Sequence, residues 1–456
     1  MSAVREQISK KLINRNYARL WYGQAISNVG DYVFDTTMTL WVATKLGAGK
    51  SWAPAAVSGL LLAAVIAIVF VGPIAGVWVD RWNHKRTMLG TEAIRAGLAG
   101  IMALISLVPA GDLPIGAWLS LIFVLVFALN SAGQLFTPAR LVTIGQVVPD
   151  EDDRNRAFGI GNATNAVAGM IGPPLAAPLL FTSGVTWALA LNALSYVVSF
   201  VAVRAIEVPE AAADAVGASV ENVGGPAPKP RFWADFKEGL HFLTHSKVFS
   251  LLILAMIAQA GTGALNTLDV FFVTENLHVA AKFYGLFSFG IGVGLIVGSL
   301  VAAKVVARLG ASRTLWITMT ATGLIYLLYA RQTTFVGGFL LAVLFIIPIA
   351  IMNTGIGPLL LVLIPQALFG RVMSVFSTFN QGTQMISMVV SGWLASSIML
   401  HFHATALGIH VGPIDTILTV AGLLIVLAGI YAFFALPSGE LSPAAQPEAS
   451  GPTGAE

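Results

Sequence analysis

Charged residues are scarce in this sequence of 456 residues. Only 10% of the residues are Asp, Glu, Lys or Arg, whereas 56% are hydrophobic and the mean hydropathy is +0.81. Soluble globular proteins carry about 25% charged residues, so this chain cannot cover itself with a solvated surface. The scarcity of charge excludes a water-soluble globular enzyme.

Cysteine is absent, which excludes a disulfide framework and any metal site built from thiolates. The phosphate-binding pattern G-x-x-x-x-G-K-[ST] is also missing, so ATP is not expected to supply energy within this chain. No expected membrane span contains two histidines, and we expect neither a metal nor a cofactor. The isoelectric point near 9.1 would suit nucleic acid binding, but the basic residues form no continuous stripe. We therefore expect a protein that is not an enzyme and has no nucleic acid partner.

Long runs without any charged residue occupy much of the chain. They cover residues 51–79, 113–139, 157–203, 248–268, 283–303, 332–370, 372–400 and 416–439. A membrane-spanning helix needs about 20 apolar residues, so most runs suit one span and 157–203 suits two. Strands of a membrane barrel would be about 10 residues long and alternate in polarity, which these runs do not. The sequence predicts an all-α membrane protein with 12 transmembrane helices, at 17–44, 53–79, 88–109, 115–138, 157–180, 184–204, 248–274, 283–306, 314–330, 334–364, 372–400 and 412–436.

The basic residues are distributed unequally between the two sides of this topology. With both termini inside, 20 of the 25 Lys and Arg lie in cytoplasmic segments, four lie outside and one, Arg95, lies within a span. The positive-inside rule therefore predicts that both termini are cytoplasmic. Residues 1–16 are polar and charged, so we expect no cleavable signal before the first span. We expect a multi-pass protein of a bacterial inner membrane, present as a monomer.

An internal repeat divides the chain into two halves. Motifs with the same offset occur after the second and eighth spans, where Gly76, Asp80, Arg81, Asn83 and Arg86 align with Ala303, Ala307, Arg308, Gly310 and Arg313. The repeat predicts two pseudo-symmetric six-helix halves, at 1–206 and 248–437. The Ala-, Gly- and Pro-rich start of 207–247 predicts a flexible cytoplasmic linker, and 438–456 has the composition of a disordered tail.

The second part of the linker has an amphipathic pattern. Phe232, Phe236, Leu240 and Leu243 share one face of a helix over residues 231–246, and the charged residues lie elsewhere on it. This pattern predicts a helix that lies on the cytoplasmic surface of the membrane.

The connection between the second and third expected spans carries a recognisable motif. It reads G-V-W-V-D-R-W-N-H-K-R, with Gly76, Asp80, Arg81, Asn83, Lys85 and Arg86 at its defining positions. This motif resembles the loop 2–3 signature of the major facilitator superfamily, and the resemblance implies a gating role for these six residues. Gly76 would let two helices approach closely, and Asn83, in place of the usual glycine, would tolerate a left-handed turn.

Further motifs resemble one branch of this superfamily, the macrolide-efflux-like drug:proton antiporters. They are W-Y-G-Q-A-I-S at 21–27, F-T-P-A at 136–139, V-P-D-E at 148–151 and G-M-I-G-P at 169–173. The last of these resembles the antiporter signature and assigns helix packing to Gly169, Gly172 and Pro173, although alanines stand where the next glycines are expected. The resemblance implies a two-half transporter fold and proton-coupled drug efflux.

Carboxylates inside the expected spans are candidates for carrying protons. A charge in the middle of a membrane costs about 2.5–3.5 kcal/mol on insertion scales, so such residues are functional candidates by default. Asp31 lies near the centre of the first span, and Asp35 is one turn further out on the same face. Two carboxylates this close should not both ionise in a low-dielectric environment. We expect Asp31 and Asp35 to take part in proton coupling, while hydrogen bonding to neighbouring helices or water contact remains an alternative.

Glu92 and Arg95 lie three residues apart in the third span and can therefore neutralise one another. We expect a structural ion pair near the 80–86 loop, with a role of Glu92 in relaying protons as the alternative.

Polar residues in the second half are candidates for contacting a substrate. Asp269 and Asn266 lie in the seventh span, Asn353 in the tenth, and Asn380 and Gln384 in the eleventh. The amides also suit ordinary contacts between helices. In the eighth span, a glycine at every fourth position predicts a smooth packing face, formed by Gly290, Gly294 and Gly298.

Three functions remain open from the sequence. The first is a secondary active transporter that exports amphipathic drugs such as macrolides by alternating access, with the drug, protons and the lipid bilayer as its partners. The second keeps the fold but exports a siderophore, another endogenous metabolite or a lysolipid, and an acidic cargo would depend on Arg95. The third is a transport-inactive membrane scaffold.

Overall fold

The computed structural model describes residues 12–109, 111–207, 232–246, 248–399, 402, 404–406 and 409–436. Helices dominate these residues, and the strands among them are β1 (Ala404–Ala406) and β2 (Ile409–Val411), which pair antiparallel. Large apolar side chains lie on the outer surface, including Leu300 and Phe434, which are 78% and 77% exposed. Such a surface is stable only in an apolar solvent such as lipid. The flexible linker and the tail that the sequence predicts lie outside the described residues, apart from the end of the linker.

The first bundle comprises the helices that precede the linker. Its elements are α2 (Arg15–Trp41) with the π-helix η1 (Val42–Leu46), α3 (Ala53–Ile66) with η2 (Ala67–Val71) and α4 (Gly72–Val79), α5 (His84–Ile105), α6 (Ile115–Val147), α7 (Glu151–Pro178) with η3 (Leu179–Ser183), and α8 (Val185–Arg204). Helix α2 packs against α7 and α8, and α5 packs against α6 and α8.

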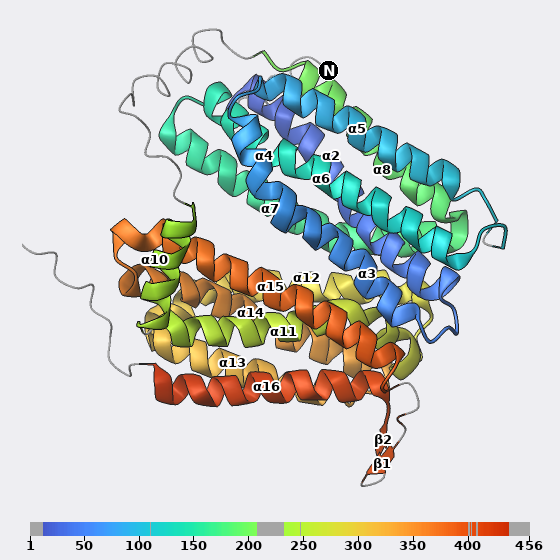
Figure 1. The fold of residues 1–456 in the computed structure, drawn as a ribbon, viewed down its shortest axis with the longest axis vertical. Coiled ribbons are helices and arrows are strands. Elements are labelled where there is room, and N and C mark those ends of the chain that lie inside the picture. Colours follow the sequence, from blue (N-terminus) through green and yellow to red (C-terminus); the bar gives the residue numbers. More distant parts are fainter. Residues whose placement is uncertain are drawn as a thin grey trace, which may run out of the picture.

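The second bundle comprises the helices that follow the linker. Its elements are α11 (Val248–Phe271) with η4 (Phe272–Asn276), η5 (Ala281–Phe283) with α12 (Tyr284–Leu309), α13 (Ala311–Tyr329), α14 (Phe335–Leu363), η6 (Gln366–Leu368) with α15 (Phe369–Ser396), and α16 (Pro413–Ala435). Helix α14 packs against α12 and α13, α13 packs against α16, and α11 packs against α15. Figure 1 shows the two bundles one above the other, and the long helices within each bundle run in roughly the same direction.

Nine helical segments of the described chain are long and apolar enough to cross a membrane. The expected spans at 17–44, 314–330 and 372–400 coincide with α2, α13 and α15, which are not among these nine. The all-helical membrane fold is therefore confirmed, and the count of 12 spans stays a prediction.

Local sequence explains where several helices begin. The side chains of Asn14, Asn83 and Asp150 each accept a hydrogen bond from a backbone N–H in the first turn of the helix that follows, which satisfies groups that have no partner within the helix. Because Asp150 caps α7, the helix starts at Glu151 and not at the expected residue 157. Helix α6 likewise continues to Val147, beyond the expected end at 138, although it contains Pro138.

The main contacts between the two bundles lie towards one of their ends. We call the end where α2 begins and α16 ends the terminal face, and the opposite end the distal face. Contacts between the bundles join α7 to α12 and α3 to α15, and the residues that meet lie towards the distal face. In Figure 1 the bundles meet on the right, on the side of the β1–β2 hairpin, and diverge on the left, on the side of α10.

Helix α10 (Phe232–Thr244) has protein partners along part of its length, and its position at the membrane surface stays a prediction. It packs against α15 and α11, with Leu243 fully buried in the apolar core of the second bundle. The Glu238 carboxylate lies 2.6 Å from the Arg371 guanidinium. The described part of the apolar face, at Leu240 and Leu243, therefore contacts protein.

Candidate functional site

A central cavity of about 1170 Å³ lies between the two bundles. Its wall includes Leu251 and Met373, near the start of α11 and α15 at the terminal face, and reaches Asp269 and Tyr284 near the distal face. Most of the wall is apolar, and its described residues include no Lys, Arg or His.

The distal end of the cavity is closed by contacts between backbones and small side chains. The backbone N–H of Ala55 in α3 donates to Ser396 Oγ in α15 at 2.9 Å. A Cβ atom at Gly285 of α12 would lie 2.6 Å from Pro174 Cα of α7, and one at Gly292 would lie 2.9 Å from Met170 Cγ. These approaches are closer than a side chain permits, so glycine lets the bundles seal this end.

The cavity brings together most of the residues that the sequence selects as substrate contacts. Asn266, Asp269, Asn353 and Asn380 line it from the second bundle. Asn380 is buried, and its Oδ1 atom has no hydrogen-bond partner among the described residues. Gln384 is not part of the wall, because its turn of α15 packs against α11, where its carbonyl oxygen would lie 2.7 Å from a Cβ atom at Gly263.

The first bundle contributes Asp35 to the same cavity. Its side chain is exposed to this space, whereas Asp31, one turn earlier on α2, is not part of the wall. The two carboxylates that the sequence groups together therefore occupy different environments.

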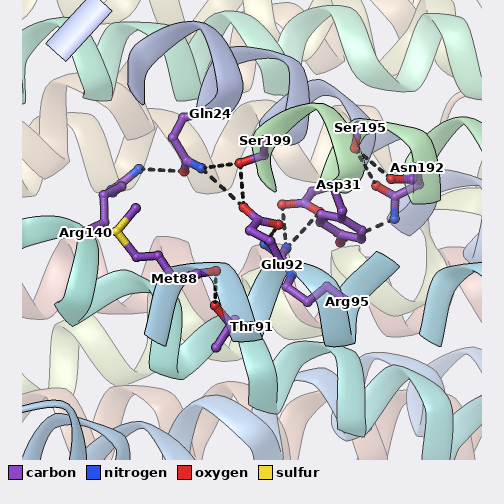
Figure 2. Close-up of polar contacts among 12 residues, drawn as sticks. Gln24, Asp31, Met88, Thr91, Glu92, Arg95, Arg140, Asn192, Ser195 and Ser199 are labelled. Carbon is purple, nitrogen blue, oxygen red and sulfur yellow. Dashed lines mark hydrogen bonds and ion pairs between the residues drawn. The ribbon is translucent and has the colours of Figure 1, made fainter. Parts of the chain in front are cut away.

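Asp31 belongs to a polar cluster inside the first bundle, which we call the Asp31 cluster. Its members are Gln24, Asp31, Glu92, Arg95, Tyr196 and Ser199, and Figure 2 labels all of them except Tyr196. Arg95 Nη2 donates to both carboxylate oxygens of Asp31, at 3.0 and 2.9 Å, and the Tyr196 hydroxyl donates to Asp31 Oδ1. The Arg95 guanidinium also lies over the Tyr196 ring, 4.1 Å from its centroid.

Glu92 is fully buried, as are Tyr196 and Ser199 of the same cluster. Its Oε1 atom accepts hydrogen bonds from Ser199 Oγ at 2.7 Å and from Gln24 Nε2 at 3.5 Å. The expected pair with Arg95 is present, but its closest atoms are 3.9 Å apart, further than those of Arg95 and Asp31. Arg95 thus links two carboxylates, and its main partner lies on another helix.

Sequence reasoning did not select Tyr196 and Ser199. Both belong to a polar row on α8, formed by Asn192, Ser195, Tyr196 and Ser199, whose spacing of three and four residues was the available signal.

Two glycines of α2 let this helix pack closely against the polar row of α8. A Cβ atom at Gly23 would lie 2.8 Å from Ala202 Cβ, and one at Gly30 would lie 2.8 Å from Ser195 Cβ.

The motif at 76–86 lies at the terminal face, away from contacts between the bundles. Lys85 Nζ donates to the Ile206 carbonyl oxygen at 2.6 Å, whereas Asp80, Arg81 and Arg86 are exposed and form no side-chain hydrogen bond or ion pair within the described chain. Two expectations for this motif are wrong in this conformation. Nothing lies within 4 Å of a Cβ atom at Gly76, and Asn83 has an extended backbone (φ −69°), because it caps α5.

The glycines assigned to packing lie at close helix contacts. A Cβ atom at Gly169 would lie 3.1 Å from the Tyr32 ring, and one at Gly172 would lie 3.2 Å from the Tyr32 carbonyl carbon, while Pro173 lines the cavity. Gly290, Gly294 and Gly298 all face α14. There, Cβ atoms at Gly294 and Gly298 would lie 2.7 and 2.6 Å from backbone oxygens.

Comparison with known proteins identifies the family of this chain. A model of the Major Facilitator Superfamily matches residues 20–381. The chain belongs to this superfamily. It is therefore a transporter, from a family that does not in general consist of enzymes.

Curated relatives of this major facilitator are distant in sequence. The uncharacterized MFS-type transporter YkuC of Bacillus subtilis is 23% identical over 431 residues, covering 93% of each chain. Macrolide efflux protein A of Streptococcus pyogenes is 22% identical over 282 residues, which cover 62% of this chain and 64% of that protein. Among solved structures, a variant of the nucleoside transporter NupG superposes with a TM-score of 0.70 at 13% identity, covering 93% of this chain and all of that one.

Proposed function

We propose that this transporter exports amphipathic small molecules from the cytoplasm and that an inward flow of protons drives the export. The distant similarity to macrolide efflux protein A supports drug efflux. The observation that carries the proposal is the Asp31 cluster, which places two carboxylates and one guanidinium inside the bundle that flanks the central cavity.

The conformation suits the uptake of a cargo from inside. If the termini are cytoplasmic, as the distribution of basic residues predicts, the terminal face is the cytoplasmic face and the structure is inward-facing. A cytoplasmic molecule then enters between the diverging bundles. Rocking the bundles about the cavity would break the distal contacts and expose the cargo to the outside, as in other transporters built from two repeats.

The charge of the Asp31 cluster suits proton exchange. Arg95 balances one negative charge, so a second ionised carboxylate would leave a net negative charge inside the bundle. Such a charge is costly in a low-dielectric environment. One proton on Asp31 or Glu92 removes it, and the proton leaves when the cluster rearranges or meets water. Asp35, on the cavity wall one turn along α2, is the third candidate for this exchange.

The cavity favours neutral or cationic cargo over acidic cargo. Its described wall carries Asp35 and Asp269 but no basic side chain. Arg95, which an acidic cargo would require, is not part of the wall and is occupied by Asp31. An acidic siderophore therefore fits less well than an amphipathic drug.

The decisive experiment measures drug accumulation in a pump-deficient bacterium that expresses the wild type, Asp31→Asn, Asp35→Asn or Glu92→Gln. Erythromycin and a cationic dye are followed with and without a protonophore. Asp112→Asn is the matched control, because Asp112 is exposed in the turn between α5 and α6.

We expect the wild type and Asp112→Asn to lower accumulation, and the protonophore to abolish this effect. Asp31→Asn should lose it as well. Unchanged accumulation in cells with well-expressed wild type would refute drug export, and export that survives the protonophore would refute proton coupling.

A further inference from the structure

Asp269 is a buried carboxylate at the distal end of the central cavity. The residue is only 5% exposed, yet it forms part of the cavity wall. The Tyr329 hydroxyl, behind the wall, donates to Asp269 Oδ1 at 2.8 Å. No Lys, Arg or His forms an ion pair with Asp269 among the residues that the structure describes, so within them its charge has no cationic partner.

Aromatic side chains lie close to this carboxylate, because the ring of Tyr329, whose hydroxyl donates to Asp269, has its centroid 6.0 Å from that of Tyr326 and 5.3 Å from that of Phe345. Tyr284, Tyr326 and Phe345 line the cavity together with Asp269. The rings of Tyr326 and Phe345 meet edge to face, with their centroids 5.3 Å apart. We call Asp269, Tyr284, Tyr326 and Phe345 the aromatic cage.

The Tyr326 hydroxyl is a second, independent sign of a missing ligand. Tyr326 is only 2% exposed, and its hydroxyl has no hydrogen-bond partner within the described chain. Buried polar groups are almost always hydrogen-bonded, because leaving one without a partner is costly. The Asp269–Tyr329 hydrogen bond could serve the structure alone, but it does not account for the missing partner of the Tyr326 hydroxyl.

We propose that the aromatic cage binds the positively charged group of a monovalent organic cation, such as a protonated or quaternary amine. A cation is attracted by the faces of aromatic rings, and this attraction grows when water is excluded. The ligand charge balances Asp269, and a polar atom beside that charge meets the Tyr326 hydroxyl. The apolar remainder of the ligand lies along the cavity wall towards the terminal face. This inference rests on the proposed function only in treating the cation as cargo.

Binding to the purified full-length protein in lipid nanodiscs tests the proposal without requiring transport. The probe is tetraphenylphosphonium, measured by equilibrium dialysis, and triphenylphosphine oxide serves as a neutral probe of similar shape. We expect saturable tetraphenylphosphonium binding that weakens about tenfold in Asp269→Asn and about fivefold in Tyr326→Leu, because a counter-charge and an aromatic face are lost. Binding of the neutral probe should change less than twofold in either variant, since apolar contacts remain.

Two control variants separate the aromatic cage from general electrostatics. Glu275→Gln removes an exposed carboxylate from η4, the continuation of α11. Glu275 is not part of the wall of the central cavity. Asp35→Asn removes the other carboxylate of the cavity wall. Glu275→Gln should bind tetraphenylphosphonium nearly as the wild type does, and Asp35→Asn should weaken binding clearly less than Asp269→Asn does. Tyr326→Phe keeps the aromatic ring, so it should bind tetraphenylphosphonium more tightly than Tyr326→Leu does. Both variants are compared as monodisperse preparations.

Three results would overturn the proposal. They are no saturable binding to the wild type, unchanged binding in a folded Asp269→Asn variant, and an equal loss in Asp35→Asn, which would assign the attraction to the overall charge of the cavity. Failure of the proposed function looks different. In that case the purified protein binds the cation through Asp269, but cells expressing it accumulate drugs as cells without it do.

Discussion

Replacing Arg95 with methionine should destabilise the protein more than any other single change in the Asp31 cluster. Methionine keeps much of the side-chain volume but removes the guanidinium that contacts Asp31 at 2.9 Å and Glu92 at 3.9 Å. Both carboxylates then lie in the bundle without a counter-charge. The side chain of Glu92 has no exposed surface and that of Asp31 is 31% exposed, so water compensates little.

The size of the effect follows from these distances. At an effective dielectric constant near 20, the Coulomb attraction of Arg95 to whichever carboxylate is ionised is about 6 kcal/mol at the distance of Asp31 and about 4 kcal/mol at the distance of Glu92. Desolvation of the charges offsets part of this attraction, and breaking a buried ion pair by removing one partner costs about 3–5 kcal/mol. Asp31→Asn should cost less, about 1–3 kcal/mol, because Arg95 keeps Glu92 as a counter-charge.

The double variant Asp31→Asn/Arg95→Met gives the sharpest test. It has one uncompensated carboxylate fewer than Arg95→Met alone, so we expect it to be more stable than that variant by about 1–2 kcal/mol. Purified proteins are heated in detergent, and the fraction that stays monodisperse is compared at each temperature. The expected order of stability is wild type, Asp31→Asn, the double variant and Arg95→Met. Equal stability of Arg95→Met and the wild type, or no rescue in the double variant, would refute the charge-balance reasoning.

Three further predictions concern the helix contacts. Because the chain has no native cysteine, Ala55→Cys/Ser396→Cys should form a disulfide that joins the bundles at the distal face and stops transport until a reductant is added. A cross-linked protein that still transports would contradict a role of this contact in alternating access. Adding Gly285→Val should lower the yield of that disulfide, since a Cβ atom there meets the backbone of α7 at 2.6 Å, and an unchanged yield would show that the contact tolerates a side chain. Gly294→Ala should cost about 1–3 kcal/mol and lower the heating midpoint, because its Cβ atom would lie 2.7 Å from a carbonyl oxygen of α14, whereas the control Gly97→Ala, with open space around it, should not.

The positions of the helices follow from the sequence because apolar runs and capping residues act locally. Most expected spans begin and end within a few residues of the observed helices. The errors have local causes too, since Asp150 caps α7 earlier than expected and α6 continues past Pro138. The spacing of Gly290, Gly294 and Gly298 likewise predicts the face that packs against α14.

The partners of the polar groups could not be predicted in the same way. Glu92 and Arg95 look like a pair because they lie three residues apart, yet Arg95 bonds more closely to Asp31, 64 residues earlier in the chain. The amphipathic pattern of α10 likewise cannot distinguish a lipid surface from the helices on which it docks.

The sequence by itself determined that this protein is a helical membrane protein, and its repeat and motifs indicated the two related halves of a transporter. Hydropathy, charge distribution and short motifs depend on neighbouring residues and can be recognised without coordinates. Only the tertiary structure decided that Asp35 and Asp269 share one cavity while Asp31 is held by Arg95 and Tyr196. The physical reason is that close packing, permitted by glycines such as Gly30, brings distant helices together, and a pattern of apolar residues specifies which face is buried but not which helix covers it.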